Sequence, residues 1–225
     1  MFHDVLFPSE EQSKSASSDN KLFLRQLVRS SLPLEVPIRD SMFIIFDLET
    51  TGLDSTLDHI IEIGAQKFCG FNLVDEFSTL IRPSHEVKEL TKHTMTLTGL
   101  TIDMLQNSPK IEEVLPKFLQ FIQQGILVAH NAEFDFSFLK VACAKIGIDL
   151  DWPCYCTIKL SKIILPELQG RNLDALANHF GFTFEARHRS IGDVKVTAEV
   201  MKAMLNDERA QNLRSWRDIH PASIN

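Results

Sequence analysis

The chain has 225 residues, of which 44% are hydrophobic, enough for one core of about 160 to 190 residues with shorter segments attached. Its formal net charge of −7 argues against a protein that coats nucleic acid non-specifically, but allows an enzyme that grips one strand end at a metal site. No apolar run approaches the roughly 18 residues of a membrane helix, and no signal peptide opens the sequence. We therefore expect a cytoplasmic protein that does not bind membranes.

Residues 1–40 differ in character from the rest of the chain. Residues 10–20 are polar and serine-rich, which is typical of disorder, and residues 21–30 have the spacing of a short amphipathic helix. This segment either packs on its own domain or docks onto a partner. We predict three parts: a partly disordered N-terminal arm at 1–40, a folded domain at 41–206 and a short C-terminal tail at 207–225.

The folded domain opens with a continuous apolar run at 42–46, the pattern of a strand buried on both faces. Two strand-like runs, 59–69 and 73–81, flank Gly70 and are predicted to pair as an antiparallel hairpin. The threonine-rich stretch 97–101 is interpreted as a loop that leads into a short helix. The remaining periodicity predicts an α/β layered domain. Helices are expected at 111–122, 157–165, 172–180 and 194–205, and another contains Phe134 and runs to about 146. Strands are expected at 126–129 and around Tyr155.

Two acids follow the first strand, Asp47 and Glu49, with Leu48 between them. Because side chains alternate along a strand, both carboxylates point to one side while Leu48 points into the core. The chain then leaves the sheet through Thr-Thr-Gly at 50–52, small residues that let the backbone approach a ligand closely. Two like charges at one strand end are costly without a cation, so the pattern fits either a metal site or two solvated acids at a turn.

A second group of polar residues follows the predicted strand at 126–129, with the sequence His130-Asn-Ala-Glu-Phe-Asp135. Asp135 lies in the first turn of a helix, one position off the apolar stripe that contains Phe134. Acids favour first turns through the helix dipole, so the position of Asp135 has a structural explanation as well as a catalytic one. His130 and Asn131 lie where a strand gives way to a helix, and they fit ligand contact or turn and capping roles equally.

The third group is His188-Arg-Ser-Ile-Gly-Asp193. Asp193 stands at the predicted start of a helix, where an ordinary N-cap would also explain it. His188 lies five residues earlier, in a loop from which its imidazole can reach over a site. With an unperturbed pKa of about 6.5, a histidine there can accept a proton near neutral pH.

In this order, Asp47-Leu-Glu-Thr-Thr-Gly, His130-Asn-Ala-Glu-Phe-Asp135 and His188-Arg-Ser-Ile-Gly-Asp193 resemble the three motifs of the DEDDh exonucleases. The resemblance covers about residues 42–205 and is to the epsilon-type 3′–5′ proofreading exonucleases of bacterial DNA polymerase III. It implies a ribonuclease H-like three-layer α/β fold, with a mixed central sheet and helices on both faces. Thr98-Gly99-Leu100 departs from the His-Gly-Ile of many relatives, which implies that a histidine contact to the substrate end is absent.

The resemblance also implies the chemistry of the site. Two divalent ions, Mg²⁺ or Mn²⁺, activate a water and stabilise the leaving 3′-oxygen. Asp47 bridges both ions, Glu49 and Asp193 hold the ion on the nucleophile side, Asp135 serves the other ion, and His188 is the general base. The implied substrate-binding residues are Leu48, Thr50, Thr51, Gly52, His130, Asn131 and Phe134.

We therefore expect a metal-dependent 3′–5′ exonuclease that removes 5′-mononucleotides from single-stranded or frayed DNA 3′ ends, in proofreading or repair. An exoribonuclease of the same branch is an alternative, because the choice rests on contacts to the 2′-OH that sequence does not reveal. An inactive nucleic-acid-binding module on the same fold is a second. The resemblance suggests a DNA polymerase catalytic subunit as a partner, although residues 207–225 contain no convincing polymerase-binding segment.

Overall fold

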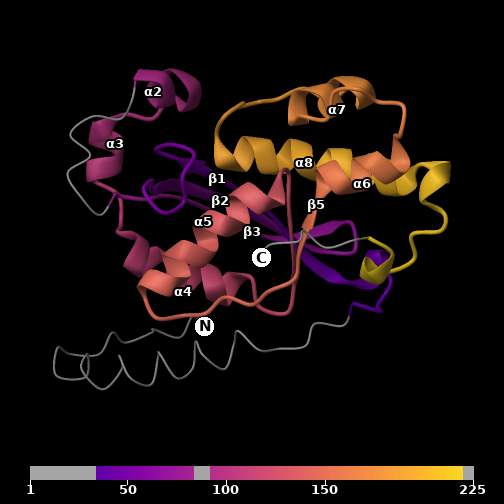
Figure 1. The fold of residues 1–225 in the computed structure, drawn as a ribbon, viewed down its shortest axis with the longest axis horizontal. Helices are drawn as coiled ribbons and strands as arrows, with labels where there is room; N and C mark the ends of the chain where they lie inside the picture. Colours follow the sequence, from indigo (N-terminus) through magenta and orange to yellow (C-terminus); the bar gives the residue numbers. More distant parts are fainter. Residues whose placement is uncertain (1–33, 84–91, 220–225) are drawn as a thin grey trace, which may run out of the picture.

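A five-stranded mixed sheet forms the centre of the protein, and helices cover both of its faces (Figure 1). The computed structural model describes residues 34–83 and 92–219. The strand order is β3-β2-β1-β4-β5, with β1, β2 and β3 antiparallel and β4 and β5 parallel to β1. The strands are β1 (Met42–Thr50), β2 (Ile60–Cys69), β3 (Asn72–Leu80), β4 (Ile126–Ala129) and β5 (Cys154–Cys156). The predicted fold class and the predicted antiparallel hairpin are confirmed.

Two hydrophobic clusters lie on opposite faces of the sheet, as the alternation of side chains along β1 requires. Ile44, Phe46 and Leu48 pack into one cluster with α4 and α5, whereas Phe43 and Ile45 pack into the other with α6, α7 and α8. The helices are α2 (Lys92–Thr98), α3 (Ile102–Gln106), α4 (Ile111–Phe121), α5 (Ala132–Lys145), α6 (Thr157–Ile164), α7 (Leu173–Phe180) and α8 (Ser190–Asn206). Short 3₁₀ turns lie at Ile38–Asp40, Glu208–Ala210 and Trp216–Asp218.

Two elements differ from their predictions. The stretch 97–101, expected as a loop, begins inside α2, which continues to Thr98, and the chain then turns at Gly99, whose φ is 70°. The short helix expected after it is confirmed as α3. Helix α8 begins at Ser190, four residues earlier than expected, so Asp193 lies inside the first turn and Arg189 occupies the N-cap position. Short polar residues such as threonine and serine have weak helix propensity, and tertiary contacts override it at both places.

Residues on both sides of the expected boundaries at 41 and 206 share one hydrophobic cluster. Ile38 is 2% exposed and Trp216 is fully buried, and the Trp216 indole N–H donates to Ser41 Oγ at 2.8 Å. Arg39 Nη2 donates to the carbonyl of Leu205 at 3.0 Å. The division into arm, domain and tail stays a prediction, and the segments at 10–20 and 21–30 lie outside the described residues. No helix in the described ranges is long and apolar enough to cross a membrane.

Candidate active site

The end of β1 supplies two of the predicted acids. Phe43 and Ile45 face α8, so the alternation carries the side chains of Asp47 and Glu49 to the same face, which α8 covers. In the antiparallel pairing with β2, Asp47 lies opposite Gly64 and Glu49 lies opposite Glu62. Leu48 points away from them and is 5% exposed in the core, as its place in the alternation predicts.

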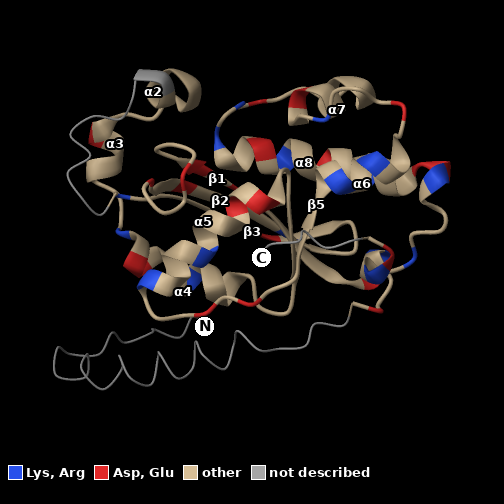
Figure 2. Cartoon of the chain, in the orientation of Figure 1, with Lys and Arg blue, Asp and Glu red and all other residues tan. Residues whose placement is uncertain are grey.

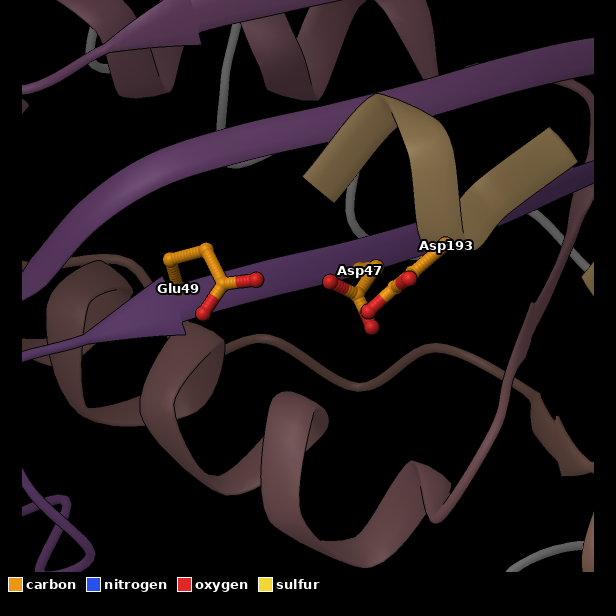
Figure 3. Close-up of side chains that lie close together, drawn as sticks. All are labelled: Asp47, Glu49 and Asp193. Carbon is orange, nitrogen blue, oxygen red and sulfur yellow. The ribbon is translucent and has the colours of Figure 1, made fainter. Parts of the chain in front are cut away.

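Helix α8 brings the third acid to this point. Its first turn lies directly on β2 at Gly64, where a Cβ atom would stand 2.5 Å from the backbone nitrogen of Ile191. That close approach places Asp193 over β1, and ligand oxygens of Asp47, Glu49 and Asp193 all lie within 4.8 Å of one another. Figure 3 shows the three side chains together, two from β1 and one from α8. The structure thus joins residues that are about 145 positions apart in the sequence.

Asp135 approaches these three acids from α5, which packs on the opposite face of the sheet from α8. It lies in the first turn of α5, is 3% exposed, and its Oδ1 accepts a hydrogen bond from the backbone N–H of Leu48 at 3.0 Å. Its charge raises the pKa of both Asp47 and Glu49, which places it within electrostatic range. It lies outside the group of three whose oxygens gather within 4.8 Å. Figure 2 shows acidic residues gathered where β1, α5 and α8 meet.

Burial and mutual repulsion disfavour the charged forms of all four acids. Burial, with repulsion from the neighbouring acids, holds the pKa of Asp47 well above its usual range and raises the pKa of Glu49 to about 8. Burial also raises the pKa of Asp135 to about 8 and that of Asp193 to about 6. Asp193 Oδ1 is buried and has no hydrogen-bond partner among the described residues. Four carboxylates supply hard oxygen donors, and the unpaired Oδ1 of Asp193 is among them, so the group fits a divalent cation.

His188 lies immediately before the N-cap residue of α8, with a left-handed backbone φ of 60°. The side chain is partly exposed, so it lies in a position that solvent can reach. Burial lowers the pKa of His188, and the positive charge of Arg187 lowers it further. The imidazole is therefore mostly neutral at pH 7, the form that can accept a proton.

Sequence reasoning missed two arginines that flank His188. The Arg187 guanidinium donates to both carboxylate oxygens of Asp174 at 3.0 Å and also pairs with Asp193 Oδ2. Arg189 pairs with the buried Glu62 on β2. The sequence Arg187-His-Arg189 was visible, but their partners on α7 and β2 follow only from the tertiary structure.

The end of β1 and the turn that follows it hold three of the predicted substrate-binding residues. Thr51 Oγ1 donates to Asp58 Oδ1 at 3.0 Å and accepts from the backbone N–H of His59 at 3.0 Å. Thr50 Oγ1 donates to the carbonyl of Gly52 at 2.6 Å. A Cβ atom at Gly52 would press on the Asp58 carboxylate, which would have to shift from its contact with Thr51. The turn is therefore fixed beside Glu49.

The predicted residues after β4 lie beside α6. His130 Nδ1 is 2.8 Å from Thr157 Oγ1, and its Nε2 is buried without a hydrogen-bond partner in the described part of the chain. Burial, with the charge of Arg187, lowers the pKa of His130 to about 4, so its ring is neutral at pH 7. Asn131 is exposed with a left-handed φ of 62°, and Phe134 packs against Phe138 with ring centroids 5.0 Å apart.

A family model described as exonuclease (RNase T) matches residues 44–201, more than two thirds of the chain. The chain belongs to this exonuclease family. Residues of the exonuclease domain are 44% identical over 162 positions to the PolC-type DNA polymerase III of Thermotoga maritima. That match covers 72% of this chain but only 12% of the relative, so the chain spans a small part of the PolC-type polymerases.

Solved structures share the fold of the exonuclease domain. Exonuclease X, in complex with 5′-overhanging duplex DNA, is 25% identical with a TM-score of 0.60, and the match covers 73% of this chain and 91% of that one. The nuclease domain of 3′hExo, a DEDDh member bound to rAMP, is 17% identical with a TM-score of 0.67, covering 82% and 98%. The predicted membership of the DEDDh exonucleases is confirmed, and the chain is a nuclease of a family that uses divalent metals.

Proposed function

We propose that this exonuclease acts in the 3′–5′ direction on single-stranded or frayed DNA 3′ ends and releases 5′-mononucleotides. The observation that carries the proposal is the gathering of Asp47, Glu49 and Asp193 within 4.8 Å, beside the buried Asp135. An inactive binding module would have no need to hold four repelling acids together, since each raised pKa marks free energy spent on their burial.

Two Mg²⁺ or Mn²⁺ ions are the cofactors that these oxygens suit, and when bound they supply a polarised water and charge stabilisation at the leaving oxygen. Asp47, Glu49 and Asp193 hold the ions where their oxygens converge, and Asp135 serves from α5. His188, neutral at pH 7, accepts the proton of the attacking water.

The terminal nucleotide binds between the turn after β1 and the start of α5. Backbone groups at Thr50, Thr51 and Gly52 are fixed beside the acids. Leu48, whose side chain is buried, contributes by donating its backbone N–H to Asp135. His130, Asn131 and Phe134 lie after β4 and complete the contact surface.

DNA is the proposed substrate because the PolC-type relative is a DNA polymerase and Exonuclease X is seen with DNA. These similarities also support a role in proofreading or repair, in the cytoplasm and with a DNA polymerase catalytic subunit as a partner. The 3′hExo domain bound to rAMP shares only the fold, so RNA trimming is the alternative that the experiment must separate.

The experiment uses single-stranded DNA and RNA oligomers of one sequence, each with a fluorescent label at the 5′ end, incubated with the full chain and Mg²⁺ or Mn²⁺. A ladder of progressively shorter labelled DNA fragments, with 5′-mononucleotides in the supernatant, is the expected result. Asp47→Ala is the control, and it should abolish turnover because it removes a metal ligand. Release of labelled mononucleotide as the first product would indicate the opposite direction, preferred RNA shortening would indicate an exoribonuclease, and binding without turnover would indicate an inactive module.

A further inference from the structure

Glu62 is a buried carboxylate that the proposed chemistry does not use. It lies in β2 with 1% exposure, directly opposite Glu49 in the strand pairing. Burial of a charge beside another acid is costly unless the charge is paired and hydrogen-bonded. The position of Glu62 therefore needs a compensating contact.

Arg189 provides that contact with a two-pronged geometry. Its Nε donates to both oxygens of Glu62 at 3.1 and 3.2 Å, and its Nη2 donates to Oε1 at 2.7 Å. The backbone N–H of Ser190 donates to Oε2 at 3.0 Å. Both oxygens of Glu62 are thus satisfied by two consecutive residues of another element.

The Ser190 contact also caps α8. The first N–H groups of a helix have no partner within the helix, and a side chain usually accepts from one of them. The N-cap residue of α8, Arg189, makes no side-chain cap hydrogen bond. Glu62 accepts the N–H of Ser190, the first residue of α8, so a strand residue far away in the sequence takes over part of the capping.

This anchor lies between the two functional residues of the third motif. Arg189 and Ser190 separate His188 from Asp193 and are tied to β2 at Glu62, while Ser190 and Ile191 rest on Gly64, two residues further along β2. Glu62 and Gly64 stand opposite Glu49 and Asp47. The same two positions of β2 therefore set where the first turn of α8 lies relative to both acids of β1.

We propose that Glu62 and Arg189 are positioning residues that lock the start of α8, and with it His188 and Asp193, onto the acids of β1. This inference rests on the proposed exonuclease function, because it assigns Glu62 and Arg189 to the reaction through His188 and Asp193. Their side chains touch neither substrate nor metal in this assignment.

The experiment compares Glu62→Ala, Glu62→Gln and Arg189→Lys with the unchanged chain. Partners that orient ligands are typically worth about 10- to 100-fold, so Glu62→Ala should lower kcat by about that factor. KM should stay within about twofold, since the proposed nucleotide contacts lie on the turn after β1 and on α5. Glu62→Gln keeps an acceptor for Ser190 and Arg189→Lys keeps the charge, so both should retain intermediate kcat values.

The matched control is Arg209→Lys. Arg209 pairs with Asp207 through the same two-pronged contact, Nε to Oδ1 and Nη2 to Oδ2 at 2.8 Å each, but on the surface. The pair lies beyond the opposite end of α8, about 25 Å from Ser190 at 1.5 Å per residue. Arg209→Lys should leave kcat, KM and Mn²⁺ affinity unchanged.

A second readout does not depend on turnover. Titration calorimetry with Mn²⁺ should show binding weakened by about tenfold in Glu62→Ala, because Asp193 is no longer held beside Asp47. Wild-type kcat and Mn²⁺ affinity in both Glu62→Ala and Arg189→Lys would overturn the inference. The inference would also be overturned if kcat of the variants fell only in proportion to the fraction of folded protein, while Arg189→Lys kept its Mn²⁺ affinity. An unchanged chain that binds Mn²⁺ but releases no nucleotides would instead overturn the proposed function, and the calorimetry would still test the anchor.

Discussion

Arg187 illustrates how one side chain adjusts the charge of the site. It pairs with Asp174 on α7 and with Asp193 on α8, and its positive charge lowers the pKa of Asp47, Glu49 and Asp193 against the larger effect of burial. The same charge lowers the pKa of the neighbouring His188. One guanidinium therefore eases the repulsion among the acids and adds to the effect of burial in lowering the pKa of the proposed base.

The His188→Gln substitution tests that base. Glutamine keeps the size and the hydrogen bonding of the side chain but cannot accept the proton, so kcat should fall by about 10² to 10⁴-fold while oligonucleotide binding stays nearly normal. In the unchanged chain the rate should rise with pH as His188 loses its proton, at a pH below its ordinary value of 6.5, and then level off. Steady-state rates from about pH 5 to pH 8 measure both effects.

The control for this substitution is His179→Gln, at an exposed histidine of α7 whose ring lies against Phe180. Its rate and pH profile should match those of the unchanged chain. An unaltered rate and profile in His188→Gln would show that the water loses its proton without this imidazole, and His188 would then be a substrate contact.

Among the contacts between elements, the one between α8 and β2 sets the position of Asp193 relative to the acids of β1. Side chains normally separate a helix from a sheet, but Gly64 has none and the backbone of α8 lies directly on β2 there. Gly192, in the first turn of α8, accommodates the loop that precedes the helix, since a Cβ atom there would overlap the carbonyl oxygen of Ala186. Gly64 thus allows α8 to bring Asp193 to the acids of β1.

Gly64→Ala should therefore damage both stability and catalysis. The added methyl group would lie 2.5 Å from Ile191 N and 2.6 Å from the carbonyl carbon of Ser190, both backbone atoms that move only with the helix. Overpacking of this kind typically costs about 1 to 3 kcal/mol, and the displaced Asp193 should lower kcat by about 10- to 100-fold. Urea unfolding and single-turnover assays measure the two effects.

Gly170→Ala is the comparison for that variant. Gly170 is exposed, and a Cβ atom there would meet only the methyl group of Ala175 at 3.1 Å, so stability and rate should change little. A Gly64→Ala protein with native stability and rate would contradict the role assigned to the close approach.

The fold as a whole offsets the repulsion among the four buried acids. The clusters on both faces of the sheet bury enough apolar surface to hold Asp47, Glu49, Asp135 and Asp193 together despite their repulsion. Since the folded protein binds protons at these carboxyls more tightly than the unfolded chain does, its stability depends on pH.

Without metal, stability should fall as pH rises between about 6.5 and 8. The pKa of Glu49 is raised from 4.5 to about 8 and that of Asp135 from 3.8 to about 8, so their contribution is full below the unfolded values and is lost through pH 8. The lowered pKa values of His130 and His188 have the opposite sign but act below pH 6.5. Thermal unfolding with EDTA, across this pH range, measures the slope.

Added Mg²⁺ or Mn²⁺ should raise Tm more at pH 8 than at pH 6.5, because the ions bind the charged carboxylates and offset their repulsion. Glu49→Gln, which removes one titrating group, should flatten the metal-free slope. Metal-free stability that increases from pH 6.5 to pH 8 would contradict the raised pKa values.

The sequence by itself determined the α/β class and the strand that carries Asp47 and Glu49, and it named Asp135, Asp193 and His188 as candidates for the site. Period-two and helical spacing are local properties, and the apolar run at 42–46 and the alternation at Asp47, Leu48 and Glu49 survive folding unchanged. Helix ends were less accurate, since α2 and the first turn of α8 depend on contacts that propensity does not contain.

Only the tertiary structure decided how these pieces meet. The pairing register places Gly64 and Glu62 opposite Asp47 and Glu49, and neither residue carries a sequence signal that would single it out. Likewise, the burial that raises the acids' pKa values and the ion pairs of Arg187 and Arg189 join residues from different elements. Register and burial arise from packing between distant segments, so local pattern names the chemical groups of this site, and the fold sets their distances and charges.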